Sequence, residues 1–174
     1  EKDVLDRYYG AAKTLQADFV LRVTSDCPLI DPVVCGRVFA EVMEDRTDYA
    51  VNNMPPSWPQ GLDCEAFSFS LLERAATEAA TSFEHEHVGF FMRSAPGVRR
   101  GNVAAEEENI SHHCWTLDEP DDYAFLQALF ARLPQGPESW NYKVPLAIVE
   151  TDPTLAAINA GKVHPAIHAD SIPR

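Results

Sequence analysis

The chain has 174 residues, 45% of them hydrophobic and 24% charged, which fits a single globular domain with a sizeable core and argues against a disordered chain. Its formal net charge of −13 argues against nucleic acid or an anionic membrane surface as the main partner, because both would be repelled. The four cysteines lack CxxC spacing and no apolar run approaches the roughly 18 residues of a membrane helix, so we expect a soluble, cytoplasmic protein with free thiols.

The first half of the chain alternates helical and strand patterns. Residues 1–16 have the spacing of an amphipathic helix, and "DFVLRVTSD" (18–26) predicts a buried parallel strand that stops at the turn "DCP". Asp31 can cap a helix whose first position is Pro32, and residues 48–53 predict the next strand. The apolar positions of the first helix are Val4, Leu5, Tyr8, Ala12 and Leu15.

The second half continues the same alternation. Residues 64–70 alternate as an extended segment, and Ser70 is the expected cap of a helix that ends near residue 80. Residues 82–94 predict another helix, and extended pieces follow. Residues 119–133 predict a helix that begins near Pro120 with carboxylates in its first turn.

This order is typical of an α/β fold, a three-layer α/β/α sandwich with a mainly parallel sheet. We expect one domain over residues 1–133, followed by a Pro-containing C-terminal extension at 134–174 with a short helix near 152–161. In such sheets ligands bind beyond the carboxyl ends of the strands. The chain opens on a helix, without the first strand and Gly-rich phosphate loop that usually open a nucleotide-binding domain.

Two apolar runs stop on a carboxylate that is closely followed by proline: "VLRVTSD" at Asp26 and "CWTLD" at Asp118. Carboxylates gathered at strand ends repel each other unless they share a hard cation, and Mg²⁺ is commonly held by one or two carboxylates plus substrate phosphates. Such a metal would let an acidic protein bind a nucleoside triphosphate, with Arg22 or Lys13 adding positive charge.

Helix capping is the alternative role for each of these acids. For Asp31, Asp121 and Asp122 we favour capping and interaction with the helix dipole over metal ligation. Asp26 and Asp118 are the better metal candidates.

A third acidic site is Asp63 and Glu65, which follow a Pro-Gly loop. Side chains two apart on a strand share a face, so this pair can converge on one ligand, although a solvated edge strand explains the pattern equally well.

Zinc is not expected, because the spacing of His85 and His87 differs from HExxH and the adjacent His112 and His113 of an extended segment face opposite sides. A nucleophilic triad is also disfavoured, since no serine or cysteine lies in a G-x-S-x-G elbow.

Several motifs taken together resemble a known family, the cytidylyltransferases of the spore coat polysaccharide biosynthesis protein F type, which are relatives of the CMP-sugar-acid synthetases. The resemblance covers residues 3–133. The motifs, in order, are "DVLDRYYGAA", "RVTSDCPLIDP", "DYAVNN", "WPQGLDCEAFSF", "EHEHV" and "WTLDEPDDYAFL".

The resemblance implies a glycosyltransferase-A-like nucleotide-diphospho-sugar transferase fold. It implies transfer of CMP from CTP to a sugar or sugar acid, with release of pyrophosphate, in surface or spore-coat polysaccharide biosynthesis. By similarity, Asp26 and Asp118 match the catalytic aspartates that hold Mg²⁺, and Arg22 and Thr24 lie on the nucleotide side.

For the sugar side, the resemblance points to a second group of residues. Position 85 is usually arginine in this motif and is His85 here, which removes a cation from the site. The residues that match the sugar-side motifs are Gly61, Asp63, Glu65, Glu86 and His87.

Family members open with a strand and a basic loop that grips the triphosphate, and we expect this chain to be N-terminally incomplete relative to them. The full-length protein would then be the Mg²⁺-dependent enzyme, while the chain alone need not catalyse. The alternatives are a metal-dependent glycosyltransferase of the same fold and a noncatalytic sugar-nucleotide-binding or assembly module. The expected partners are CTP and the acceptor, with a homodimer possible through the apolar segment 139–149.

Overall fold

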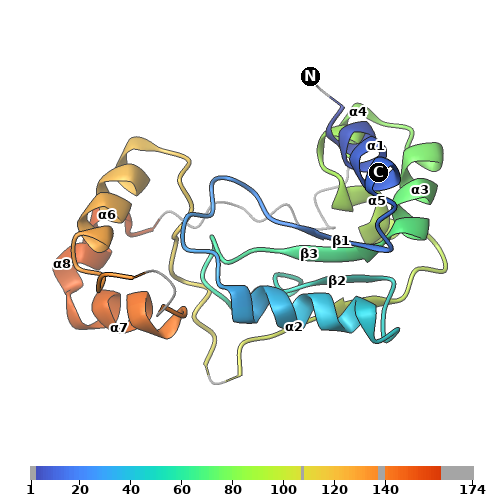
Figure 1. The fold of residues 1–174 in the computed structure, drawn as a ribbon. Helices are drawn as coiled ribbons and strands as arrows, with labels where there is room; N and C mark the ends of the chain where they lie inside the picture. Colours follow the sequence, from blue (N-terminus) through green and yellow to red (C-terminus); the bar gives the residue numbers. More distant parts are fainter. Residues whose placement is uncertain (1–2, 107, 137–139, 162–174) are drawn as a thin grey trace.

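The computed structural model describes residues 3–106, 108–136 and 140–161, where a four-stranded sheet is combined with helices (Figure 1). The strands, in the spatial order β1-β3-β2-β4, are β1 (Phe19–Arg22), β3 (Glu65–Ser68), β2 (Tyr49–Val51) and β4 (Arg100–Asn102).

Strand direction follows the expected α/β class in one respect and departs from it in another. β1, β2 and β4 point the same way, as a mainly parallel sheet requires. However, β3 lies between β1 and β2 and runs antiparallel to both, so β2–β4 is the parallel pairing of the described sheet. The α/β/α fold class is confirmed, and the reversed β3 is the feature that the alternating pattern did not predict.

One face of the sheet is covered by α2 (Pro32–Met43), which lies along the strands in Figure 1. Its buried side chains Val38 and Val42 pack on Ala50 and Ala66, whose small size lets the helix approach closely.

The opposite face is covered by α1 (Val4–Leu15), α3 (Phe69–Glu78) and α5 (Gly89–Ser94), grouped at one end of the sheet (Figure 1). The helical spacing placed Leu15 on the apolar face of α1, but the structure does not bury it: in the last turn of the helix, Leu15 is 78% exposed. These helices and the sheet enclose an apolar core. Strands β2 and β3 contribute Tyr49, Val51 and Phe67 to this core.

Two helix boundaries differ from the expected ones. Ser68 rather than Ser70 caps α3, because its Oγ accepts a hydrogen bond from Leu71 N at 3.3 Å. The helix expected over 82–94 is two helices, α4 (Ser82–Glu86) and α5, since the backbone leaves helical geometry at His87.

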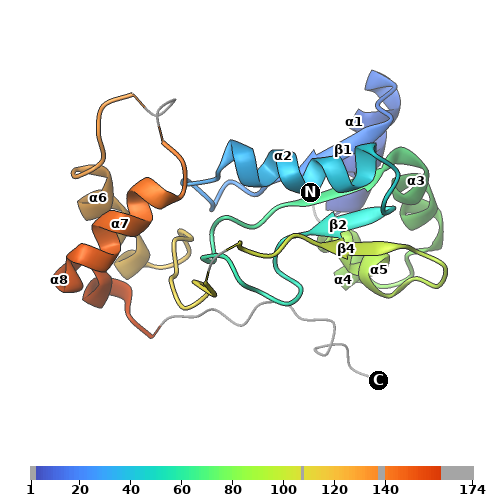
Figure 2. The same ribbon diagram turned by 90° about the horizontal axis from the view of Figure 1, so that it is seen from below.

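A second helical cluster lies at the other end of the sheet (Figures 1 and 2). It consists of α6 (Pro120–Phe130), α7 (Lys143–Thr151), α8 (Pro153–Ala156) and the 3₁₀ helix η2 (Ala157–Asn159). Buried side chains of α6, α7 and α8 share one apolar cluster, so residues on both sides of position 133 pack together. The division into a domain and an extension stays a prediction.

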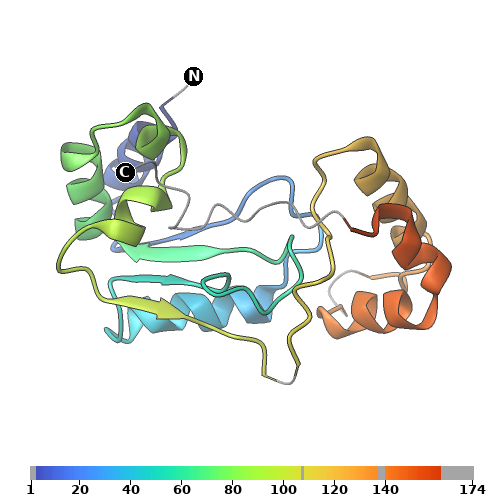
Figure 3. The ribbon, with the colours of Figure 1, turned by 180° about the vertical axis from the view of Figure 1, so that it is seen from behind.

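The segment between β4 and α6 crosses from one end of the molecule to the other (Figure 3). The strand expected at "CWTLD" is wrong: Cys114 forms an isolated bridge with Gln60, and the segment is otherwise irregular. Within the described residues, no helix combines the length and apolarity needed to cross a membrane.

Candidate functional site

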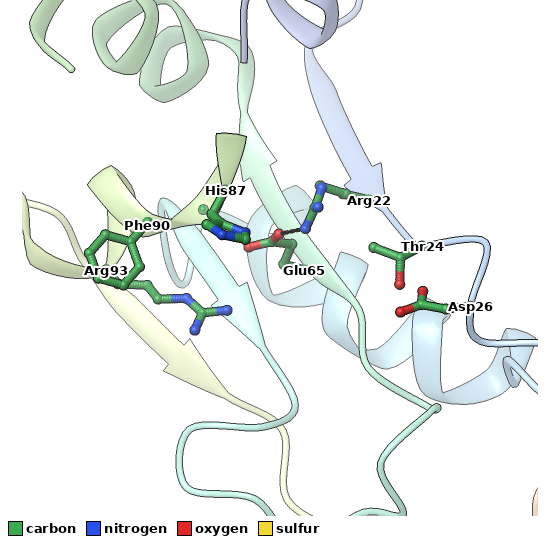
Figure 4. Close-up of a pocket in the computed structure, with 8 residues that line it drawn as sticks. Arg22, Thr24, Asp26, Glu65, His87, Phe90 and Arg93 are labelled. Carbon is green, nitrogen blue, oxygen red and sulfur yellow. Dashed lines mark hydrogen bonds and ion pairs between the residues drawn. The ribbon is translucent and has the colours of Figure 1, made fainter. Parts of the chain in front are cut away.

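A cavity of about 280 Å³ opens where β1 ends (Figure 4). A second cavity of about 60 Å³ shares four of its lining residues, so we treat the two as one central cleft. The larger cavity is lined by Arg22, Thr24, Asp26, Glu65, His87, Gly89, Phe90 and Arg93. The smaller one adds Asn53, Asp63 and Cys64.

Asp26 lies in the turn that follows β1, and its carboxylate is drawn beside Thr24 in Figure 4. The main-chain carbonyl of Asp26 accepts a hydrogen bond from Leu117 N at 2.9 Å. This bond brings the segment that carries Asp118 against the turn that carries Asp26.

Asp118 is exposed and does not line either cavity of the central cleft. Its main-chain N–H donates to Asp122 Oδ2 at 3.3 Å, and Glu119 N donates to the same oxygen at 2.9 Å. Asp122 is therefore a capping residue of α6, as expected, while the convergence of Asp26 and Asp118 on one metal stays a prediction.

The residues present fit a magnesium ion in their chemistry. Carboxylate oxygens are the ligands that Mg²⁺ prefers, and it is usually bound by one or two of them plus substrate phosphates and water. Across the described part of the chain, no group of three or more His, Cys, Asp or Glu is arranged to hold a metal. That Asp26 and Asp118 hold such an ion together with a substrate stays a prediction.

Asp63 and Glu65 both line the smaller cavity, so the pair shares a face, as its spacing predicts. The edge-strand alternative is excluded, because β3 has a neighbour on each side. Asp63 accepts hydrogen bonds from Asn53 Nδ2 at 3.0 Å and Gly61 N at 3.1 Å. Burial raises the pKa of the Asp63 carboxyl, opposed by these two hydrogen bonds.

Glu65 is buried, and both of its carboxylate oxygens accept hydrogen bonds. Oε1 is paired with Arg22 Nη1, and Oε2 accepts from the Tyr49 hydroxyl at 2.6 Å. The carboxylate therefore serves neighbouring protein side chains.

The backbone conformation and the packing at position 61 explain why a glycine is found there. Its φ of +105° is disfavoured for other residues, and a Cβ there would lie 2.6 Å from the carbonyl carbon of Trp115. It lines neither cavity of the cleft, and it acts on the site by shaping the turn before Asp63.

The two members of the "EH" pair have different positions. His87 lines the larger cavity, whereas Glu86 is exposed at the end of α4 and lines neither cavity. His85, at the position where the motif usually has arginine, lines neither cavity. Its Nδ1 instead lies 2.8 Å from Asp3 Oδ2, just before α1.

Five residues that line the cleft were not predicted as site residues: Asn53, Cys64, Gly89, Phe90 and Arg93. The buried Tyr49, whose hydroxyl accepts a hydrogen bond from Arg93, was not predicted either. The signal for Arg93 is a single cation within the apolar run "VGFFMR", since arginine is rarely buried without a partner. Nothing in the pattern of β2 distinguishes Tyr49 from an ordinary core aromatic residue.

Comparisons with known proteins support the fold. The solved structure of a cytidylyltransferase from Leptospira borgpetersenii serovar Hardjo-bovis superimposes with a TM-score of 0.82 at 25% identity, over 89% of this chain and 65% of that one. The chain is 32% identical over 98 residues to the uncharacterized protein MJ1063 of Methanocaldococcus jannaschii, and 25% identical over 142 residues to the spore coat polysaccharide biosynthesis protein SpsF of Bacillus subtilis. No family model matches the chain.

These matches cover different shares of each protein. They include 56% and 79% of this chain, but only 39% of the archaeal relative and 58% of the Bacillus relative. The chain thus has the fold of a cytidylyltransferase and spans part of the length of its relatives.

Proposed function

We propose that the protein containing this chain is a cytidylyltransferase that transfers CMP from CTP to a sugar or sugar acid and releases pyrophosphate. The observation that carries the proposal is a polar cleft with Asp26 at the carboxyl end of β1, in a fold shared with a solved cytidylyltransferase. Ligands of α/β sheets bind at this end of the strands. The likeness to a spore coat polysaccharide biosynthesis protein supports a role in polysaccharide synthesis.

In this reaction an acceptor oxygen attacks the α-phosphorus of CTP in line with the departing pyrophosphate. The main tasks of the protein are to position the two substrates and to balance the negative charge that they bring. Mg²⁺, when bound, would supply that charge balance at the phosphates, with Asp26 and Asp118 as its protein ligands.

The remaining cleft residues would bind and orient the substrates. Thr24 presents a hydroxyl beside Asp26, and Arg22 lies two residues before it on β1. His87 lines the larger cavity and Asp63 the smaller one, and both side chains can form hydrogen bonds with hydroxyl groups of the acceptor. The hydrogen bond from Leu117 N to the Asp26 carbonyl holds together the two segments that carry the proposed metal ligands.

The reaction is tested by incubating the whole protein with Mg²⁺, CTP and a panel of sugars and sugar acids, and by measuring pyrophosphate. Pyrophosphate release that requires an acceptor and prefers CTP over UTP, ATP and GTP is expected. A glycosyltransferase would instead consume a nucleotide-sugar and release no pyrophosphate. If no acceptor yields pyrophosphate while CTP still stabilises the protein against heat, a noncatalytic binding module replaces the proposal.

A further inference from the structure

Two cysteines that the proposed reaction does not use meet where α2 packs on the sheet. Cys35 lies one helical turn before Val38 on the buried side of α2, and Cys64 directly precedes β3, two residues before Ala66. Positions three apart on a helix, or two apart on an extended segment, share a face. The contact between α2 and β3 therefore continues to the two thiols, which are buried in the same apolar cluster.

The two thiols share a hydrogen bond that affects their acidity unequally. This bond lowers the pKa of Cys35 by more than burial and the nearby Asp31 raise it. The same bond, and then burial, raise the pKa of Cys64. Cys64 is therefore the S–H donor, and Cys35 is the sulfur on which negative charge is favoured. A thiolate is the form of cysteine that peroxides oxidise.

The other two cysteines have different neighbours. Cys27 Sγ lies 3.4 Å from Thr24 Oγ1, and Cys114 Sγ lies 3.3 Å from Thr116 Oγ1. Burial raises the pKa of Cys114, and it raises the pKa of Cys27 to about 12. All four cysteines of the chain are free thiols, and Cys35 is the one whose pKa is lowered.

The central cleft gives a small oxidant access to this pair. Cys64 lines the smaller cavity, of about 60 Å³, which shares four lining residues with the larger one. A water molecule needs only about 10 to 15 Å³ of such space, and hydrogen peroxide is not much larger. The segment at Cys64 is also fixed, because its N–H donates to Asn52 Oδ1 at 3.0 Å. The thiols are thus held in contact beside a cavity.

We propose that Cys35 and Cys64 are a reversible redox pair, which hydrogen peroxide closes to a disulfide between α2 and the wall of the central cleft. The Cys35 thiolate first attacks one peroxide oxygen, which gives a sulfenic acid and hydroxide. The Cys64 sulfur then attacks the sulfenic sulfur, the S–O bond breaks, and the oxygen leaves as water with the Cys64 proton. In sum, two thiols and one hydrogen peroxide give one disulfide and two waters, and a dithiol reverses the oxidation.

Closure should alter the cleft, because Cys64 lies between Asp63 and Glu65. A sulfur–sulfur bond is about 2 Å long, which is shorter than a hydrogen-bonded contact between thiols, so Cys64 has to move toward α2. Asp63 lines the smaller cavity and Glu65 is paired with Arg22, so a shift of their main chain displaces both carboxylates. This consequence for activity rests on the proposed function, whereas formation of the disulfide does not.

Mass spectrometry of the whole protein tests the pair without any need for turnover. The reduced protein is incubated with hydrogen peroxide, its remaining thiols are alkylated under denaturing conditions, and its peptides are mapped. We expect a peptide that joins Cys35 to Cys64, with Cys27 and Cys114 still alkylated, and dithiothreitol should restore all four thiols. Because this mapping uses the wild type, it does not depend on the folding of a variant.

Three variants assign the chemistry to each sulfur. Cys35→Ala should form no disulfide, and Cys64→Ser should stop at a sulfenic acid on Cys35, which dimedone traps. Cys114→Ser is the control and should still form the disulfide. Peroxide should lower pyrophosphate release by the wild type at least about tenfold, reversibly with dithiothreitol, because small displacements of positioning groups are costly in rate. Cys35→Ala should keep its activity under the same treatment.

The redox pair is overturned if the wild type keeps four free thiols after peroxide, or if the disulfide joins other cysteines. A mapped disulfide that leaves pyrophosphate release unchanged overturns the effect on the cleft. Absence of pyrophosphate release from the reduced protein would contradict the proposed function instead, and the peptide map would still decide the redox pair. The two failures are therefore distinguishable.

Discussion

Glu65 shows how a residue's chemistry depends on its partners. An acid two residues after Asp63 at the start of a strand has the pattern of a substrate ligand, yet the structure gives both of its oxygens to Arg22 and Tyr49. A buried carboxylate is costly unless it is paired and hydrogen-bonded, and here both conditions are met. Its carboxylate is consequently the counterion of Arg22 and the hydrogen-bond acceptor of Tyr49.

Gly89 offers a direct test of that packing. Gly89→Ala should lower the free energy of unfolding by about 1 to 3 kcal/mol, because the added methyl group overlaps Glu65 Oε2 and Tyr49 Oη. Urea denaturation measures the change. Gly36→Ala is the matched control: it lies in α2 with open space around it, and should raise stability by about 0.5 to 1 kcal/mol. Equal effects at both positions would contradict the close contact.

At the scale of elements, Asp31 connects two helices that are far apart in sequence. Its Oδ1 caps α2 by accepting hydrogen bonds from Val33 N at 2.7 Å and Val34 N at 3.0 Å. Its Oδ2 accepts a third from Tyr142 N at 2.6 Å, at the start of α7. The capping role was predicted from the Asp-Pro sequence and is confirmed, whereas the contact with α7 was not foreseeable.

Asp31→Ala should therefore cost more than an ordinary cap. We expect a loss of about 2 to 4 kcal/mol in the free energy of unfolding, since the N-terminus of α2 loses a buried cap and the partly buried main-chain N–H of Tyr142 loses its partner. Asp152→Ala removes a more exposed cap of the same kind, from α8, and should cost about 1 kcal/mol. Urea titrations of the two variants compare them, and similar losses would show that the bond to Tyr142 contributes nothing.

The segment before α6 carries a pH-sensitive residue. Burial, and then the neighbouring His112, lower the pKa of His113 from 6.5 to about 4. Because the folded state favours neutral His113, its contribution to stability is fully present above pH 6.5 and is lost as the pH falls toward about 4.

The sign of this effect can be measured by comparing variants. The free energy of unfolding of the wild-type protein should fall across that window more steeply than that of His113→Gln, which cannot take up the proton. His112→Gln serves as the control and should keep most of the wild-type slope, since His113 still has to be protonated on unfolding at low pH. Parallel pH profiles for wild type and His113→Gln would contradict the lowered pKa.

The starts of helices were the structural features that the sequence predicted best. Asp31-Pro32 and the acidic first turn after Pro120 predicted the starts of α2 and α6, because caps and proline act locally. The break at His87 and the irregular path of "CWTLD" were missed, since both depend on distant contacts: Gly89 packs on Glu65, and Trp115 packs on Gly61. Local patterns do not contain such approaches.

For the whole molecule, the order of motifs was sufficient to predict the fold class. The structure places Asp26, Asp63 and Glu65 along one cleft. Two parts of the site could not be predicted. The reversed β3 places Glu65 opposite Arg22, a pairing that depends on strand order, and Arg93 reaches the cleft only because α5 folds back over β2 and β3.

The negative charge of the whole chain also limits how a triphosphate can bind to it. A protein with a net charge of −13 can bind a triphosphate only where cations compensate locally, and the central cleft contains two arginines beside one predicted metal ligand. Activity should accordingly require a divalent cation and disappear on chelation with EDTA. Full activity after chelation would argue that the arginines alone supply the compensation.

The cytidylyltransferase activity and its metal ligands are tested most directly by measuring pyrophosphate release from CTP by the whole protein and by its Asp26→Asn and Asp118→Asn variants. We expect Mg²⁺-dependent release by the wild type and a loss on the order of a hundredfold or more in each variant. Asp45→Asn, at a side chain that is 87% exposed, should retain wild-type activity. Near-normal release by the Asp26→Asn or the Asp118→Asn variant would contradict the assignment of these two residues as the metal ligands, and no release by the wild type would contradict the proposed function.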